Sequence, residues 1–140
     1  MRQTSVAVFV HLVWATWDRL PLLTDAIRRP VYRAIAAKCR ELKADVVAVG
    51  GVEDHIHLLV QLPATLSVAD LVRHVKGATS HLVTHQLTPD RFFKWQGAYG
   101  AFSVGYAQLA PLVAYIANQA DHHAAASLIP EWELPSEGEE

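Results

Sequence analysis

The sequence has little cysteine: Cys39 is the only one among 140 residues. A single cysteine cannot form a disulfide within the chain, so the fold depends on a buried core, and a reducing, cytoplasmic setting is expected. The apolar run at residues 6–15 is far shorter than the roughly 20 residues of a membrane-spanning helix, so no membrane segment is expected. Internal repeats and low-complexity stretches are also missing. Since 51% of the residues are hydrophobic, the chain can form the core of one compact domain.

Positive charge is missing from the end of the chain. The last ten residues contain five glutamates and no lysine or arginine. The formal net charge is −2, but residues 1–130 hold 12 basic and 14 − 5 = 9 acidic residues, a net charge of +3. This mildly basic body is compatible with nucleic acid binding but does not require it. We therefore expect one domain at residues 1–128 and an acidic, poorly ordered tail at residues 129–140.

Hydrophobic periodicity predicts four strands and three helices. Strand-like alternation, helical spacing and turn residues divide the chain in the order strand, helix, strand, strand, helix, strand, helix. This order is typical of the α+β ferredoxin-like fold, β-α-β-β-α-β with an antiparallel sheet, followed here by a C-terminal helix. The expected strands are 5–16, 44–49, 55–62 and 99–104. The first expected helix begins near residue 29, the second spans 67–86 and the third spans 108–125.

Two residues within the predicted helices need explanation. Pro30 lies too far from the helix start signal at Thr24 for one unbroken helix, because proline removes a backbone hydrogen bond inside a helix. We therefore expect a short turn at 24–28 and a helix that begins near Arg29. Gly77, inside the second helix, suggests a close approach to the sheet or to another backbone.

The tripeptide His55-Ile56-His57 opens the third predicted strand. Alternation along a strand places the two histidines on one face and Ile56 on the other. With roughly 3.3 Å of rise per residue, the two imidazoles lie about 6.6 Å apart and can converge on one metal ion. The same spacing also fits two unrelated polar positions on the open face of a half-buried strand. His11, on the first strand, fits a core histidine with a satisfied hydrogen bond or a residue that faces the site.

The final predicted helix brings a phenol and a carboxamide together. At 3.6 residues per turn, Tyr115, Gln119 and His122 lie on one stripe, while Ile116 and Ala117 lie toward the other side and can pack. A tyrosine on a half-buried helix is usually a packing residue. The amide oxygen of Gln119 is nevertheless a hard ligand, and with two histidines it makes a three-ligand metal site with open positions.

The segment from Asp54 to Val60 resembles the HUH motif (histidine, hydrophobic residue, histidine) of the single-tyrosine transposases encoded by the smallest insertion sequences. It also resembles the related REP-associated tyrosine transposases. The likeness covers most of the chain, and several motifs in matching order are far more specific than a His-x-His pair alone. The other matching segments are His11 to Thr16 with Arg19, Val75-Lys76-Gly77 with Ser80, Trp95-Gln96 with Tyr99 to Val104, and Tyr115 to Gln119 with His122-His123.

This resemblance implies a metal-dependent transposase that cleaves and rejoins single-stranded DNA, often at a hairpin at the element end. It assigns Tyr115 as the nucleophile, which keeps the 5′ end as a phosphotyrosine while the 3′ hydroxyl leaves and later rejoins. It assigns His55, His57 and Gln119 as ligands of Mg²⁺ or Mn²⁺. It also implies a homodimer in which the tyrosine can serve the partner's metal site.

Contacts with single-stranded DNA need basic groups and aromatic stacking surfaces. The candidates for this role are Arg73, Lys76, Arg91, Lys94 and Trp95. Each of them also fits an ordinary solvated surface position. Two alternatives without catalysis stay open: a domesticated transposase that only binds DNA, and an RNA-binding ferredoxin-like module whose aromatic strand face stacks bases.

Overall fold

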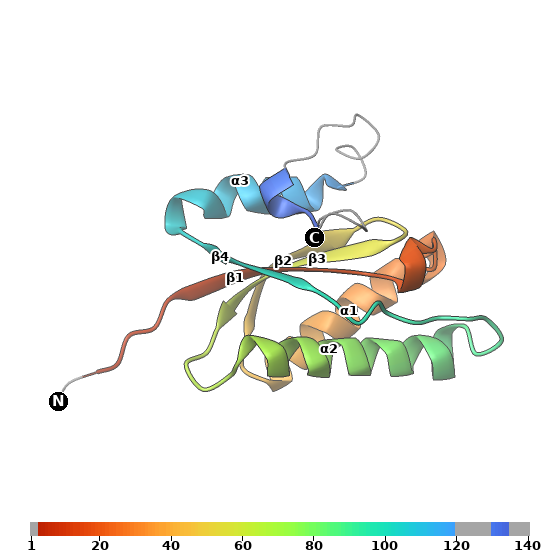
Figure 1. Ribbon diagram of the computed structural model, residues 1–140. Coiled ribbons are helices and arrows are strands. Elements are labelled where there is room, and N and C mark those ends of the chain that lie inside the picture. The colour runs from red at the N-terminus through yellow and green to blue at the C-terminus, as the bar shows by residue number, and fades with distance from the viewer. Residues whose placement is uncertain (1–2, 120–129, 135–140) are drawn as a thin grey trace.

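A four-stranded antiparallel sheet with the strand order β2-β3-β1-β4 forms the middle layer of the protein (Figure 1). The computed structural model describes residues 3–119 and 130–134. Strand order and pairing confirm the α+β ferredoxin-like arrangement. The main elements are β1 Val8–Ala15, α1 Asp25–Glu41, β2 Asp45–Gly51, β3 His55–Leu62, α2 Val68–Leu82, β4 Gly100–Val104 and α3 Tyr106–Ala117. The short helices are η1 Trp17–Arg19, η2 Val83–Leu87 and η3 Pro130–Trp132.

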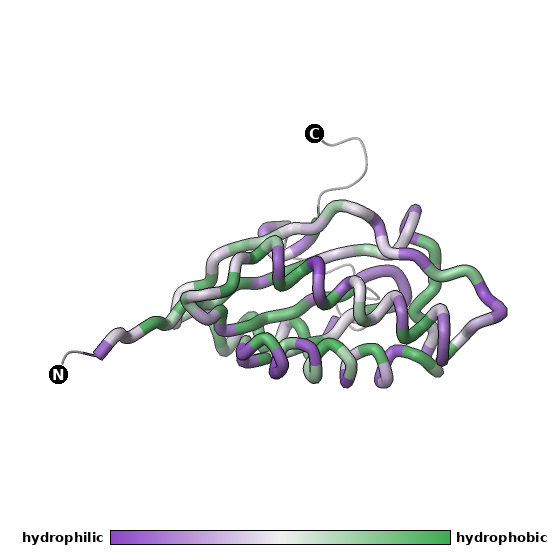
Figure 2. Tube along the Cα trace, turned by 90° about the horizontal axis from the view of Figure 1, so that it is seen from below, coloured by the Kyte–Doolittle hydropathy of each residue, from purple (hydrophilic) through white to green (hydrophobic). Residues whose placement is uncertain are grey.

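Helices cover both faces of the sheet. In Figure 1, α1 and α2 lie below the sheet and α3 lies above it. The larger core fills the space on the α1 and α2 side and includes Trp14, Ile56 and Leu58, all 0% exposed. A smaller core on the α3 side includes Leu59 and Leu112. Figure 2 shows that hydrophobic and hydrophilic residues alternate along the helical turns, as expected for helices with one buried face. β1 and β3 are thus buried on both faces.

The expected break in the first helix is wrong, because α1 is one continuous helix with Pro30 inside it. Ile27 and Val31 lie on either side of Pro30, and both are buried on the core-facing stripe of α1. An interior proline costs roughly 3 kcal/mol, whereas burying one large aliphatic side chain contributes about 1.5–3 kcal/mol. Burial on both sides of the proline therefore offsets the hydrogen bond that it removes.

The close approach that we expected at Gly77 is also wrong. A Cβ atom built at Gly77 meets nothing within 4 Å. The close approach is at Gly50 of β2, where a Cβ atom would lie 2.6 Å from the carbonyl oxygen of Ile116 on α3. The missing side chain at Gly50 is what lets α3 lie directly on the sheet.

The C-terminal helix α3 begins at Tyr106, two residues earlier than the sequence predicts. Gln108 explains this start, because its side-chain oxygen accepts a hydrogen bond from the Gly105 backbone N–H at 3.0 Å. The predicted end at 125, like His122 and His123, falls outside the described residues. Among the described residues, no helix has the length and apolar character needed to cross a membrane.

Candidate active site and metal centre

The two histidines of β3 lie on the face of the sheet that α3 covers. Ile56 belongs to the core on the opposite face, so the predicted alternation along this strand is confirmed. His55 is 1% exposed and His57 is 0% exposed. The ring centroid of His57 lies 6.0 Å from that of Tyr115 on α3. The histidines therefore lie inside the protein, between the sheet and the helix that carries the tyrosine.

Each histidine uses its Nδ1 atom for a contact within the protein. His55 Nδ1 lies 2.7 Å from Asp54 Oδ1, and His57 Nδ1 lies 2.9 Å from His11 Nε2. A carboxylate only accepts hydrogen bonds, so His55 donates from Nδ1 to Asp54. The same arrangement is common for metal-binding histidines, whose second ring nitrogen donates to a carboxylate or another acceptor. The Nε2 atoms of both rings are thus directed toward the site.

The sequence left open whether His11 is a core histidine or faces the site. In the structure it is 0% exposed and also contacts His57, so it is both. Burial, together with the neighbouring His57, lowers the pKa of His11 to about 3. Its Nδ1 atom has no hydrogen-bond partner among the described residues. His11 is therefore neutral at ordinary pH and can accept a hydrogen bond from His57 through Nε2.

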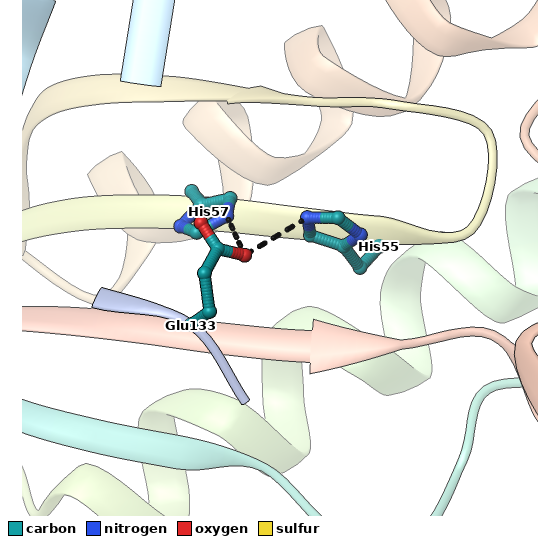
Figure 3. Close-up of side chains that lie close together, drawn as sticks. All are labelled: His55, His57 and Glu133. Carbon is teal, nitrogen blue, oxygen red and sulfur yellow. Dashed lines mark hydrogen bonds and ion pairs between the residues drawn. The ribbon is translucent and has the colours of Figure 1, made fainter. Parts of the chain in front are cut away.

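Glu133 brings a carboxylate into this cluster from the C-terminal segment (Figure 3). Its Oε1 atom lies 3.4 Å from His55 Nε2 and 3.2 Å from His57 Nε2. Its Oε2 atom accepts a hydrogen bond from the Tyr115 hydroxyl. Burial disfavours the charged carboxylate, but the hydrogen bonds from His55, His57 and Tyr115 outweigh burial and lower the pKa of Glu133. The carboxylate is therefore ionised.

Charges on Asp54 and Glu133 also act on His55. Burial disfavours the imidazolium form, but hydrogen bonds to Asp54 and Glu133 outweigh burial and raise the pKa of His55 to about 9. The site thus favours positive charge at the position that the histidines and Glu133 surround. One potential ligand atom from each of His55, His57 and Glu133 lies within 4.8 Å of the others. Two imidazoles and a carboxylate suit a divalent metal ion, so these three residues could hold one.

Sequence reasoning missed Glu133. A glutamate in an acidic, proline-containing tail has the composition of a solvated segment, and no local pattern distinguishes it from its neighbours. In the structure, residues 130–134 of the expected tail return to the site, where Trp132 packs against Tyr115 with ring centroids 5.0 Å apart. Only this tertiary contact identifies Glu133.

Tyr115 and Gln119 lie on the buried side of α3. Tyr115 is 2% exposed and packs with Leu112 and Ile116, so the expected separation of a polar stripe from a packing face is wrong. The physical reason is that the sheet beneath α3 holds both apolar residues and the histidines, so one helix face must meet both. Gln119 is 1% exposed, and its side-chain amide donates to the Tyr115 carbonyl at 3.3 Å.

Trp95 is a core residue, which contradicts its expected role as a base-stacking surface. It is 6% exposed and lies edge-on to the rings of Trp14 and Phe93. Its indole N–H donates to Thr79 Oγ1 at 3.0 Å. The alternation of aromatic and basic residues suggested a surface, but the ring has no exposed face on which a base could stack.

The four basic candidates differ in their surroundings. Arg73, Arg91 and Lys94 are exposed. The ammonium group of Lys94 lies 4.1 Å from the centre of the Trp17 ring, which is itself 41% exposed. Lys76 is half-buried and donates to two backbone carbonyl groups of the loop before β4. Lys94 with Trp17 is thus an exposed pair of a cation and an aromatic ring, whereas Lys76 helps to hold the loop.

The fold and the cluster define a class: a ferredoxin-like domain with a buried candidate metal centre beside a tyrosine-bearing helix. Residues 4–119 match the family described as transposase IS200-like, and the chain belongs to this family. Its fold is similar to that of a Deinococcus radiodurans protein described as a candidate transposase. That match has a TM-score of 0.69 and 22% identity and covers 85% of this chain and 95% of that chain.

A second similar structure is a REP-associated tyrosine transposase bound to a REP hairpin. The match has a TM-score of 0.68 and 15% identity, and it covers 96% of this chain and 79% of that chain. No curated protein sequence gives a significant match. The family assignment confirms the resemblance seen in the sequence motifs.

Proposed function

We propose that this transposase cleaves and rejoins single-stranded DNA with Tyr115 as the nucleophile. His55, His57 and Gln119 are the proposed ligands of Mg²⁺ or Mn²⁺. One observation carries the proposal: the Tyr115 hydroxyl and the Nε2 atoms of both histidines contact the same carboxylate. The proposed nucleophile and the two histidines therefore lie within the width of one carboxylate group, which is also the scale of a phosphate group.

The proposed reaction is an exchange of phosphodiester bonds. The phenol of tyrosine has an ordinary pKa near 10 and must lose its proton to attack. A bond forms between the phenolic oxygen and phosphorus, the bond to the 3′ oxygen breaks, and that oxygen leaves as a hydroxyl. A divalent ion bound at the site would polarise the phosphate and neutralise charge that develops in the transition state. The phosphotyrosine keeps the bond energy for rejoining.

The hydrogen bonds around the histidines support this function. With Nδ1–H donated to Asp54, a neutral His55 has its lone pair on Nε2, as metal binding requires. His57 has the same tautomer when it donates to the neutral His11. Asp54 and His11 therefore hold both rings in the orientation of ligands, ready to bind a metal ion once Nε2 has lost its proton.

We further propose that the substrate is hairpin DNA with a single-stranded flank, as the hairpin-bound relative suggests. The exposed Lys94–Trp17 pair supplies a positive charge and an aromatic ring, the two features of single-strand binding surfaces. It lies near the site, since the neighbouring Thr16 donates its backbone N–H to the Asp54 carbonyl at 2.9 Å. A homodimer is part of this proposal, although Tyr115 contacts the histidine of its own chain.

Formation of a covalent protein–DNA adduct tests the proposed chemistry. The purified protein with Mn²⁺ or Mg²⁺ is incubated with labelled hairpin oligonucleotides from the DNA that flanks its gene, and adducts are separated on denaturing gels. The wild type is expected to retain the 5′ product. Tyr115→Phe should abolish the adduct, because only the hydroxyl is lost.

Tyr99→Phe is the matched control, because Tyr99 is 37% exposed and removal of its hydroxyl should leave adduct formation unchanged. An adduct that survives Tyr115→Phe would show that another residue is the nucleophile. Tight hairpin binding without any adduct in the wild type would favour a domesticated protein that only binds DNA.

A further inference from the structure

Glu133 is the described residue that links the proposed metal ligands to the proposed nucleophile. Its side chain is only 12% exposed although it lies in the acidic C-terminal segment. The segment is anchored on both sides of it, since Trp132 packs against Tyr115 and the Leu134 side chain reaches Gly100 on β4. The position of the carboxylate is thus fixed by apolar contacts as well as by its own hydrogen bonds.

The spacing of the nitrogen and oxygen atoms fits ligands of one ion. Two atoms that each lie about 2.1 Å from a metal, at angles between octahedral and tetrahedral, are roughly 3.0–3.4 Å apart. Glu133 Oε1 lies 3.4 Å from His55 Nε2 and 3.2 Å from His57 Nε2. Direct hydrogen bonds of imidazole to carboxylate are usually shorter, near 2.7–2.9 Å when charged.

The hydrogen-bond chemistry leads to the same conclusion. Both Nδ1 atoms are engaged, by Asp54 and by His11, so each ring directs its Nε2 atom at Glu133 Oε1. In the metal-free protein, protons on Nε2 join the two nitrogens to this carboxylate oxygen. A divalent ion takes the place of these protons when it binds, because a histidine ligand must be deprotonated at the nitrogen that holds the metal.

We propose that Glu133 is a ligand of the metal ion and that its second oxygen holds the Tyr115 hydroxyl beside that ion. The centre then has two histidines and one carboxylate within the described residues, with Gln119 as a further proposed ligand. Mg²⁺ and Mn²⁺ favour octahedral coordination with oxygen ligands, so positions remain for a phosphate oxygen and water. The inference rests on the proposed function only for the presence of a divalent ion.

Metal affinity without DNA tests this inference. Mn²⁺ binding is measured by calorimetry and by the electron paramagnetic resonance signal of free Mn²⁺. Glu133→Gln removes the negative charge with almost no change in shape, and we expect Mn²⁺ affinity to fall about 10–100-fold or more. Glu133→Asp keeps the charge and should bind Mn²⁺ more tightly than Glu133→Gln does.

Glu131→Gln is the matched control, because Glu131 lies in the same short helix η3 but is exposed. It should bind Mn²⁺ as the wild type does. Thermal unfolding of the metal-free variants checks that they are folded. If Glu133→Gln does not fold, the Mn²⁺ affinity of Glu133→Asp is compared with that of the wild type to test the ligand role. A Glu133→Gln protein that binds Mn²⁺ within twofold of the wild type overturns the inference.

Adduct formation separates this inference from the proposed function. Unchanged Mn²⁺ affinity with faster adduct formation in Glu133→Gln would mean that the carboxylate competes with the DNA phosphate, which overturns the ligand role. A selective loss of Mn²⁺ affinity, with no adduct from any variant or the wild type, would support the ligand role while the proposed DNA cleavage fails.

Discussion

His55 and Asp54 are neighbours in the sequence that together act as one unit in the site. The Asp54 carboxylate accepts from Nδ1 of His55 and so fixes both the orientation of the ring and the tautomer. The carboxylate also increases the basicity of Nε2, the nitrogen that faces the proposed metal site.

We predict that Asp54→Ala lowers Mn²⁺ affinity about 10–100-fold, the usual effect of losing such a partner of a metal-binding histidine. Calorimetric titration of the metal-free protein with Mn²⁺ measures this. Glu53→Ala is the control, since Glu53 is exposed and next to Asp54 in the sequence. Equal affinities of the two variants would rule out this role for Asp54.

At the scale of elements, the distance between α3 and the sheet decides whether Tyr115, the proposed nucleophile, reaches the histidines. Gly50 on β2 is the cross-strand partner of His57 and lies against the Ile116 carbonyl, next to Tyr115 in α3. Gly50 therefore lies next to both His57 on the sheet and the turn of α3 that carries Tyr115. A side chain at this position has no room unless α3 moves outward.

We predict that Gly50→Ala destabilises the protein by about 1–3 kcal/mol, as overpacking usually does, and reduces adduct formation. Gly77→Ala is the matched change at a glycine with open space, and it should stabilise α2 by about 0.5–1 kcal/mol. Urea unfolding of both variants measures the free energies. Gly50→Ala with unchanged stability and adduct yield would contradict the argument.

At the scale of the whole molecule, charge is divided between a mildly basic body and an acidic C-terminal segment. Residues 1–130 carry a net charge of +3, counted as 12 basic minus 9 acidic residues. Binding to a nucleic acid strand releases counterions, so each lysine or arginine that contacts a phosphate contributes to the salt dependence of affinity.

We predict that Lys94→Ala weakens binding of a single-stranded oligonucleotide and lowers the slope of log affinity against log salt by about 0.7. Fluorescence anisotropy at several salt concentrations gives both values. Arg40→Ala is the control, because Arg40 is exposed on α1, which covers the face of the sheet opposite α3. The same slope change in both variants would mean that Lys94 has no specific phosphate contact.

Most of the fold follows from local patterns. The apolar runs of β1 and β3 and the helical spacing of α2 depend on neighbours in the sequence, so composition and spacing suffice to predict these elements. Pro30 shows where local rules fail, because the burial of Ile27 and Val31 is a tertiary contribution that outweighs a local penalty. The prediction for Trp95 fails in the same way, because the ring is buried in the core and is not available as a stacking surface.

The sequence by itself determined the order of the elements, the shared face of His55 and His57, and the candidates Tyr115 and Gln119, because period and motif are local properties. Tertiary structure alone decided that Glu133 joins the two histidines and the tyrosine hydroxyl. The contact between β3 and the C-terminal segment spans more than seventy residues. It depends on packing against α3, which no local pattern records.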